Sequence, residues 1–235
     1  PNLFAPTALT FSIWGVIYLL LGAHVLYQLG LFQNVGAGDE QPEASDASAR
    51  QQLLERVGVL FSASSLANAA WILAWHYDLI GLSTALLMTM LVLLIAITRT
   101  VIASATSLRD RVFLRLPFSV YFGWLTVATI ANITVWLVSI GWDGFGVAES
   151  TWAVAIIAVG ALVGSVVILR DRDIAYGLVL VWAYFGIWLK HTSASGFAGA
   201  HPDVIAAVIA GIAAFVVVGV VALVRRPAVA VAAHA

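Results

Sequence analysis

Seven long stretches of this chain carry almost no charged side chains, and they constrain its fold more than any other feature of the sequence. They are residues 9–31, 57–77, 80–103, 117–140, 151–169, 174–190 and 203–224. An α-helix needs about 20 apolar residues to cross the hydrocarbon core of a bilayer. The chain is also 62% hydrophobic and only 10% charged, which no soluble domain of this length matches. The sequence therefore predicts an all-α, polytopic membrane helix bundle with seven transmembrane helices.

Basic residues divide very unequally between the two sides of the predicted membrane. If successive spans alternate in direction, Lys190 lies on one side and every other basic residue lies on the opposite side. Arginine and lysine gather on the cytoplasmic side of membrane proteins. We therefore expect a multi-pass protein of the plasma (inner) membrane, with its first residue outside and its carboxyl terminus in the cytoplasm. The cytoplasmic residues would be Arg50, Arg56, Arg99, Arg109, Arg111, Arg115, Arg170, Arg172, Arg225 and Arg226.

The longest hydrophilic segment, residues 34–56, separates the first two spans. Its Gly, Ala, Ser, Pro and acidic residues cannot bury a core, so we expect a mobile cytoplasmic loop. The last part, "ASARQQLLER" at residues 47–56, is compatible with two structures. One is an amphipathic helix on the membrane surface and the other is a solvated loop.

The residues that the chain lacks argue against several classes of function. It has no cysteine, so disulfides and thiolate chemistry are excluded. The last span contains no lysine for a retinal Schiff base, and no acidic residue lies deep in any span to serve a proton relay. Walker, HExxH and GxSxG motifs are missing as well. We therefore predict no catalytic residues, no metal site and no nucleic-acid partner.

Aromatic and amide side chains gather on one face of three spans. They recur every three or four residues, as positions on one face of a helix do. An unpaired amide in lipid costs several kcal/mol, so Asn68 and Asn132 are expected to face the bundle interior together with the rings beside them. They either hold helices together or line a ligand cavity, and the cavity also explains the rings. The three sets are Phe11, Trp14, Tyr18 and Gly22; Asn68, Trp71 and Trp75; and Tyr121, Trp124, Ala128, Asn132 and Trp136.

Two further features have more than one interpretation. His24 is the only histidine well inside a span, where it could ligate haem iron, shuttle protons or form a structural hydrogen bond. The "GALVG" segment at residues 160–164 has the GxxxG spacing that lets helices approach closely.

Three of these patterns resemble the TspO/MBR family, also called tryptophan-rich sensory or translocator proteins. "WGVIYLLLG" (14–22), "LANAAW" (66–71) and "YFGWLTVATIAN" (121–132) match the family's W-x-x-x-Y-x-x-x-G, L-x-N-x-x-W and Y-x-x-W-x-x-x-A-x-x-x-N motifs, in the family's order. The similarity covers about residues 6–139.

The resemblance also implies where the chain departs from the family's five-helix plan. Its first four spans would match the family's helices two to five, so an eighth helix is expected upstream of Pro1. Of the family's Trp- and Pro-rich lid loop only "PNLFAP" remains. We expect residues 1–140 to form the TspO-like four-helix portion with the 34–56 loop, and residues 141–235 to add three helices without a counterpart.

The resemblance implies a receptor or sensor that binds a flat hydrophobic ligand in an aromatic intramembrane pocket. The ligand would be a tetrapyrrole, such as porphyrin or haem, or a sterol-like molecule. The lining would be Trp14, Tyr18, Asn68, Trp71, Tyr121, Trp124, Ala128 and Asn132, with His24, Trp75 and Trp136 as secondary candidates.

Other functions stay open at this point. The alternative is a small-molecule membrane transporter, and the family's light-dependent porphyrin breakdown leaves enzymatic turnover open. A third reading is an accessory subunit that docks a partner through Gly160 and Gly164. A homodimer is compatible with each of these.

Overall fold

The computed structural model describes residues 2–31, 44–104 and 107–224, and these residues contain helices and turns but no strand. Seven of the helices are long and apolar enough to cross a membrane, which confirms the predicted fold class. Each one coincides with a predicted span, although several begin or end some residues away from the expected limits. These helical spans are Ala8–Gln28, Ser48–His76, Ile80–Ser104, Leu108–Ser139, Glu149–Asp171, Ile174–Thr192 and Pro202–Val224.

The membrane-length helices are joined by short turns and one-turn helices. In chain order the elements are η1 (Ala8–Ser12), α1 (Ile13–Gln28), α2 (Ala44–His76), α3 (Ile80–Ser104), α4 (Leu108–Asp110), η2 (Arg111–Arg115), α5 (Leu116–Ser139), η3 (Gly144–Gly146), α6 (Glu149–Asp171), α7 (Ile174–Thr192) and α8 (Pro202–Val224). Side chains cap some of the tight junctions. For example, the Asp173 carboxylate accepts a hydrogen bond from the Tyr176 backbone N–H at 3.0 Å and starts α7 directly after α6.

Helix α2 begins well before the predicted second span. Residues 44–56 are its first turns, so the predicted loop is wrong for residues 44–46, and of the two structures open for residues 47–56 the helix is the one present. Residues 34–43 lie outside the described residues. The extension is helical because it has partners inside the bundle. Leu53 is buried, and the Arg50 guanidinium lies 3.7 Å from the Asp110 carboxylate and over the Tyr27 ring. The segment is therefore a continuation of a membrane helix and not a separate surface helix.

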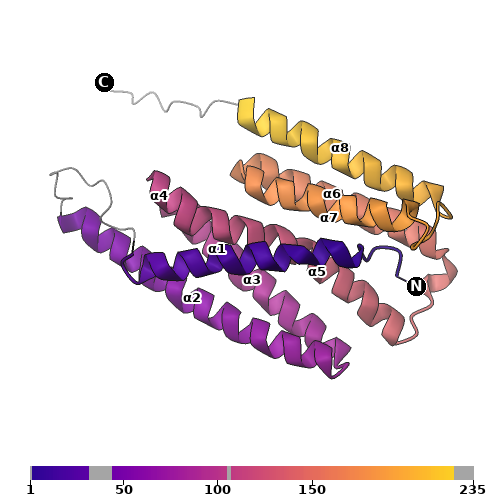
Figure 1. The fold of residues 1–235 in the computed structure, drawn as a ribbon, viewed down its shortest axis with the longest axis horizontal. Helices are drawn as coiled ribbons and strands as arrows, with labels where there is room; N and C mark the ends of the chain where they lie inside the picture. Colours follow the sequence, from indigo (N-terminus) through magenta and orange to yellow (C-terminus); the bar gives the residue numbers. More distant parts are fainter. Residues whose placement is uncertain (1, 32–43, 105–106, 225–235) are drawn as a thin grey trace.

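The helices form two groups that meet along α5 (Figure 1). The first group contains α1, α2 and α3: α2 packs on α3, and both α3 and α1 pack on α5. The second group contains α6, α7 and α8, in which α8 packs on both of its neighbours. Contacts between α5 and α7 join the two groups.

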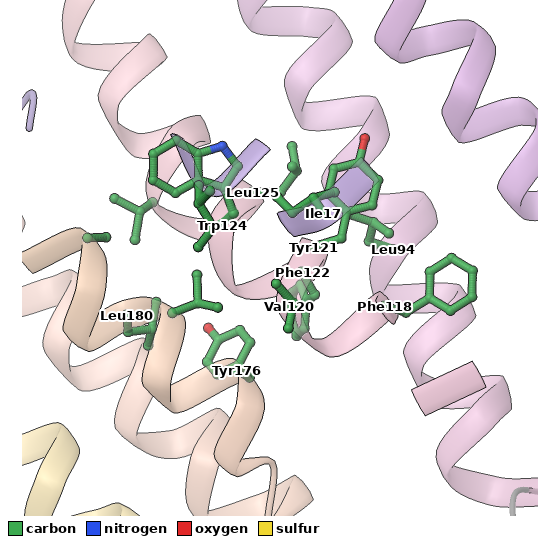
Figure 2. Packing of buried hydrophobic residues seen from close by; sticks show 14 of the residues in the cluster. Ile17, Leu94, Phe118, Val120, Tyr121, Phe122, Trp124, Leu125, Tyr176 and Leu180 are labelled. Atoms are coloured by element: carbon green, nitrogen blue, oxygen red, sulfur yellow. The ribbon is translucent and has the colours of Figure 1, made fainter. Parts of the chain in front are cut away.

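Helix α5 is the centre of the bundle. Every residue from Pro117 to Val127 is buried, which is typical of a helix surrounded by other helices. Figure 2 shows Tyr121 and Trp124 on one side of α5, and Tyr176 and Leu180 of α7 on the other. The two helices approach closely at Gly123, where an added Cβ would lie 3.0 Å from the Tyr176 carbonyl oxygen.

The GxxxG segment of α6 faces helices of the same chain. An added Cβ at Gly160 would lie 2.6 Å from the Tyr184 hydroxyl, and one at Gly164 would lie 2.7 Å from the Phe215 ring. Close helix approach at this motif is thus confirmed. The idea that a partner docks through Gly160 and Gly164 is wrong, because α7 and α8 already cover both glycines.

One cluster of polar contacts between helices lies at one end of the bundle. Arg99 of α3 donates to the Asp171 carboxylate of α6 at 2.6 Å, and Arg115 of η2 donates to the Asp171 carbonyl oxygen, also at 2.6 Å. Ser119 of α5 donates to the Asp173 carboxylate. These contacts bring the arginine-bearing ends of α3, η2 and α6 together.

Candidate ligand-binding site

A cavity of about 460 Å³ lies between α1, α2, α3 and α5, toward the end of the bundle opposite Arg99 and Asp171. We call it the aromatic cavity. Its wall is apolar apart from a few polar atoms, and six of its fourteen lining residues are aromatic. The lining residues are Ala5, Pro6, Phe11, Trp14, Tyr18, Trp71, Trp75, Leu87, Trp124, Val127, Ala128, Ala131, Asn132 and Val135.

Trp14 is the centre of the aromatic wall. Its ring is stacked with those of Tyr18 and Trp71, at centroid distances of 5.5 and 5.6 Å. Trp124 meets Trp14 edge to face at 6.4 Å, and Phe11 meets Trp124 in the same way at 5.4 Å. Such contacts between rings restrain each ring's orientation. The wall is therefore an ordered surface contributed by three helices and the turn η1.

Asn132 provides the amide of the cavity and faces the interior, as predicted. It is 4% exposed, accepts a hydrogen bond from the Thr84 hydroxyl at 2.6 Å and donates one to the Ser83 hydroxyl at 3.0 Å. An amide NH₂ group can donate twice, so one N–H remains beyond the bond to Ser83. Two hydroxyls of α3 thus fix the orientation of the Asn132 amide.

Two indole N–H groups in the wall lack partners. The Nε1 atoms of Trp71 and Trp124 are buried and form no hydrogen bond with any described residue. A buried donor left unsatisfied costs about 1 to 3 kcal/mol. A ligand with acceptor atoms at its edge would recover that free energy.

Two predicted lining residues, Asn68 and Tyr121, belong to a neighbouring hollow instead. This second hollow, of about 290 Å³, is lined by Tyr18, Leu21, Gly22, Val25, Phe61, Ser65, Asn68 and Tyr121. The Asn68 amide is turned toward α1 and donates to the Tyr18 hydroxyl at 3.4 Å. Tyr18 lines both hollows, so its ring stands between them.

The N-terminal segment, residues 2–12, closes one end of the aromatic cavity through Ala5, Pro6 and Phe11. Helix α7 anchors it. The Trp182 indole donates to the Thr10 carbonyl oxygen at 3.0 Å, and the His191 ring donates to the Leu3 carbonyl oxygen at 2.8 Å. The described part of the "PNLFAP" segment, residues 2–6, thus lies where a lid would, and one of the last three helices holds it there.

The three secondary candidates differ in position. Trp75 lines the aromatic cavity, whereas Trp136 does not, because its indole Nε1 lies over Gly81 of α3. The buried His24 ring donates to the Phe113 carbonyl oxygen at 2.9 Å and meets Phe118 edge to face. Neither His24 nor Trp136 reaches the cavity.

Several residues that line the cavity or hold its amide were not expected from the sequence. The spacing of three and four residues already placed Phe11 on the face of Trp14 and Tyr18, so its signal was present. Ser83 and Thr84 gave only a weak signal, as two adjacent hydroxyls in an apolar span. Ala5 and Pro6 belong to the "PNLFAP" segment, which the resemblance had marked as a remnant of the lid, whereas nothing in the sequence pointed to Leu87.

Comparison with known proteins gives one finding. The family model described as TSPO-like protein matches residues 1–222, which is longer than the similarity expected over residues 6–139 and includes α6, α7 and α8. No curated protein and no solved structure matches the chain. Together with the seven apolar helices, the match makes this a multi-pass membrane protein of the TspO type. The chain belongs to the TSPO-like protein family.

Proposed function

We propose that this protein is an integral membrane receptor or sensor for a flat hydrophobic ligand held in the aromatic cavity. The observation that carries the proposal is the stacked wall of Trp14, Tyr18 and Trp71, which borders about 460 Å³ of space. Apolar cavities with a few converging polar groups are the usual form of small-molecule sites. A planar ring system, such as a tetrapyrrole or a sterol-like molecule, fits such a wall face to face.

The lining residues favour binding by stacking over binding through a metal. No histidine, cysteine or methionine is among them, and His24 is turned toward Phe113 instead. A porphyrin would therefore be held by its ring faces. The unpaired indole N–H groups of Trp71 and Trp124 would donate to acceptor atoms at its edge, such as carboxylates.

The position of the cavity suggests a side for ligand entry. We infer from the positive-inside rule that the end with Arg99 and Arg115 faces the cytoplasm. The aromatic cavity lies toward the other end, beside the N-terminal segment. The ligand would then enter from the outer half of the inner membrane.

Tryptophan fluorescence of the purified chain tests the proposal. Addition of protoporphyrin should quench the emission with saturation, because the porphyrin would lie against several indole rings. The variant with Trp124→Ala and Asn132→Ala removes one ring and the fixed amide. Losing central contacts of this kind typically costs about 2 to 4 kcal/mol, which weakens binding about 30- to 1000-fold.

The matched control is Trp188→Phe, which removes an indole from α7 outside the cavity. It should lower total emission while the midpoint of the porphyrin titration stays the same. Unchanged quenching in a correctly folded Trp124→Ala, Asn132→Ala variant would overturn the proposal.

A small-molecule transporter is the second candidate. The observation that favours it is that Tyr18 lines both the aromatic cavity and the second hollow, so the two hollows adjoin. Porphyrin flux into liposomes that contain the protein would identify a transporter. Saturable binding without flux would identify a receptor or sensor.

A further inference from the structure

A separate groove lies between the two helix groups and shares no residue with the aromatic cavity. We call it the α3–α6 groove. Its apolar walls are Leu91 and Ile95 of α3 and Val163 and Val167 of α6, its floor includes Phe122 of α5, and its volume is about 170 Å³. Ile95 is 39% exposed and Val163 45% exposed, so the groove opens outward. In a membrane its mouth faces the lipid chains.

One end of the groove is cationic. Arg99 and Asp171 line it there and form an ion pair of 2.6 Å. The Asp171 side chain is only 3% exposed, whereas those of Arg99 and Arg170 are 38% and 68% exposed. The negative charge is therefore buried and neutralised, and the surface toward the membrane edge presents guanidinium groups.

A third arginine adds to this charge. Arg115 donates from η2 to the Asp171 carbonyl oxygen at 2.6 Å. Three arginines thus contact Asp171, two at its carboxylate and one at its carbonyl oxygen. Even with the buried Asp173 carboxylate counted, positive charge is in excess at the mouth of the groove. Guanidinium groups bind phosphate oxygens through several N–H donors at once.

The apolar part and the cationic end match the two parts of a phospholipid. From Leu91 to Arg99 the groove follows α3 for about 12 Å, which suits the upper part of an acyl chain. Arg99 lies near the end of its membrane span, at the depth where lipid headgroups lie. Basic pockets between helix ends are a known mode of anionic lipid recognition.

We propose that the α3–α6 groove binds one anionic phospholipid. Its acyl chain lies between Ile95 and Val163, and its phosphate is held by Arg99 and Arg170. An anionic lipid is favoured over a zwitterionic one because the excess positive charge has no counter-charge on the exposed surface of the groove. A lipid seated there bridges the two helix groups, since α3 and α6 contribute opposite walls.

Native mass spectrometry of the full chain in detergent tests the proposal with two probes, dioleoyl phosphatidylglycerol and dioleoyl phosphatidylcholine. The wild-type protein should retain the anionic lipid at lower concentration than the zwitterionic one. Arg170→Gln should weaken retention of phosphatidylglycerol about fivefold, as expected for one positive charge near a membrane surface. Val163→Trp should abolish retention because the indole fills the groove.

Two control variants test whether a loss of lipid retention comes from this groove or from any removed charge or added bulk on the surface. Arg56→Gln removes an exposed charge from the same end of the bundle but outside the groove, and Leu162→Trp adds an indole at an outward-facing position that does not line it. Both should retain phosphatidylglycerol as the wild type does.

Three results would overturn the proposal. One is equal retention of the two lipids by the wild type. Another is a loss of phosphatidylglycerol retention in Arg56→Gln as large as that in Arg170→Gln. The third is thermal stabilisation by inorganic phosphate that equals stabilisation by phosphatidylglycerol, which would indicate a site for free anions. Porphyrin binding is not measured in any arm, so failure here leaves the proposed function standing.

Discussion

Gly186 of α7 determines how closely the N-terminal segment seals the aromatic cavity. A Cβ added there would lie 2.8 Å from Cγ2 and 2.9 Å from Cβ of Thr10, whose side chain is 2% exposed. The Gly186 carbonyl oxygen also accepts a hydrogen bond from the Thr7 backbone N–H at 3.2 Å. Gly186→Ala should therefore push the segment away from α7 without changing a cavity residue.

The free-energy cost of Gly186→Ala follows from its contacts with Thr7 and Thr10. Overpacking of a tight interface costs about 1 to 3 kcal/mol, a range that includes the strain on the hydrogen bonds of Thr7 and Thr10. Helix α7 stays helical whether the segment is attached or detached, so the better helix propensity of alanine does not change this balance. The cost of about 2 kcal/mol should raise the population with a detached segment about 30-fold.

Thiol labelling measures that population directly, because the chain has no cysteine of its own. In an Ala5→Cys background, a water-soluble maleimide should react faster when Gly186→Ala is added, by up to about 30-fold, because position 5 is partly exposed even with the segment in place and the added labelling follows the open population. Gly177→Ala on the same helix is the control. Its Cβ would meet only the flexible end of Ile168, at 3.1 Å, so the labelling rate should stay the same.

Equal labelling rates in folded Gly186 and Gly186→Ala proteins would refute the reasoning. That result would mean that Thr10 adjusts within its site and that α7 does not hold the segment.

Two further variants test the packing of the second helix group. Gly211→Ala should cost about 1 to 3 kcal/mol, because its Cβ would lie 2.6 Å from the Tyr184 ring, whereas Gly219→Ala has nothing within 4 Å and should not lower the unfolding temperature in detergent. Arg99→Gln should cost about 2 to 3 kcal/mol, because the buried Asp171 carboxylate loses its 2.6 Å partner and keeps only the 3.9 Å contact with Arg170; the cost is less than for a fully buried pair because 38% of the Arg99 side chain is exposed. Adding Asp171→Asn should recover part of that loss, and no recovery would contradict an electrostatic cause.

The membrane helices could be predicted because hydropathy and length alone decide them. A span such as residues 203–224 has no competing structure in a bilayer, where every backbone polar group must be bonded within the segment. The structure places this helix at Pro202–Val224. The ends of a span predicted from composition therefore agree closely with the observed ends of the helix where the flanking residues are polar or proline.

The start of α2 could not be predicted in the same way. Residues 44–56 are polar and contain no apolar run, so hydropathy gives no signal for a helix there. Their helix is supported by particular tertiary contacts, such as those of Arg50 with Tyr27 and Asp110. Contacts of this kind depend on how α1 and α4 are placed, which the local sequence does not reveal.

For the candidate site, the recurring aromatic and amide residues identified the inward face of each helix. They did not identify the neighbour that each residue contacts. Trp124, Ala128 and Asn132 share one face of α5 and line one cavity. Tyr121, one turn earlier, lines the hollow beside Asn68 instead. Which hollow a residue reaches depends on where α1 and α2 cross α5, and spacing within one helix carries no information about that crossing.

The lid contacts make the two helix groups interdependent. Trp182 and Thr10 are 172 positions apart in the chain, yet their hydrogen bond holds the segment that closes the aromatic cavity. Without α7, the first four membrane helices would keep the rings of Trp14, Trp71 and Trp124 but lose the anchor of the lid. The family match also continues through residues 141–222. We infer that α7 helps to form the candidate site, because it holds the segment that covers one end of the aromatic cavity.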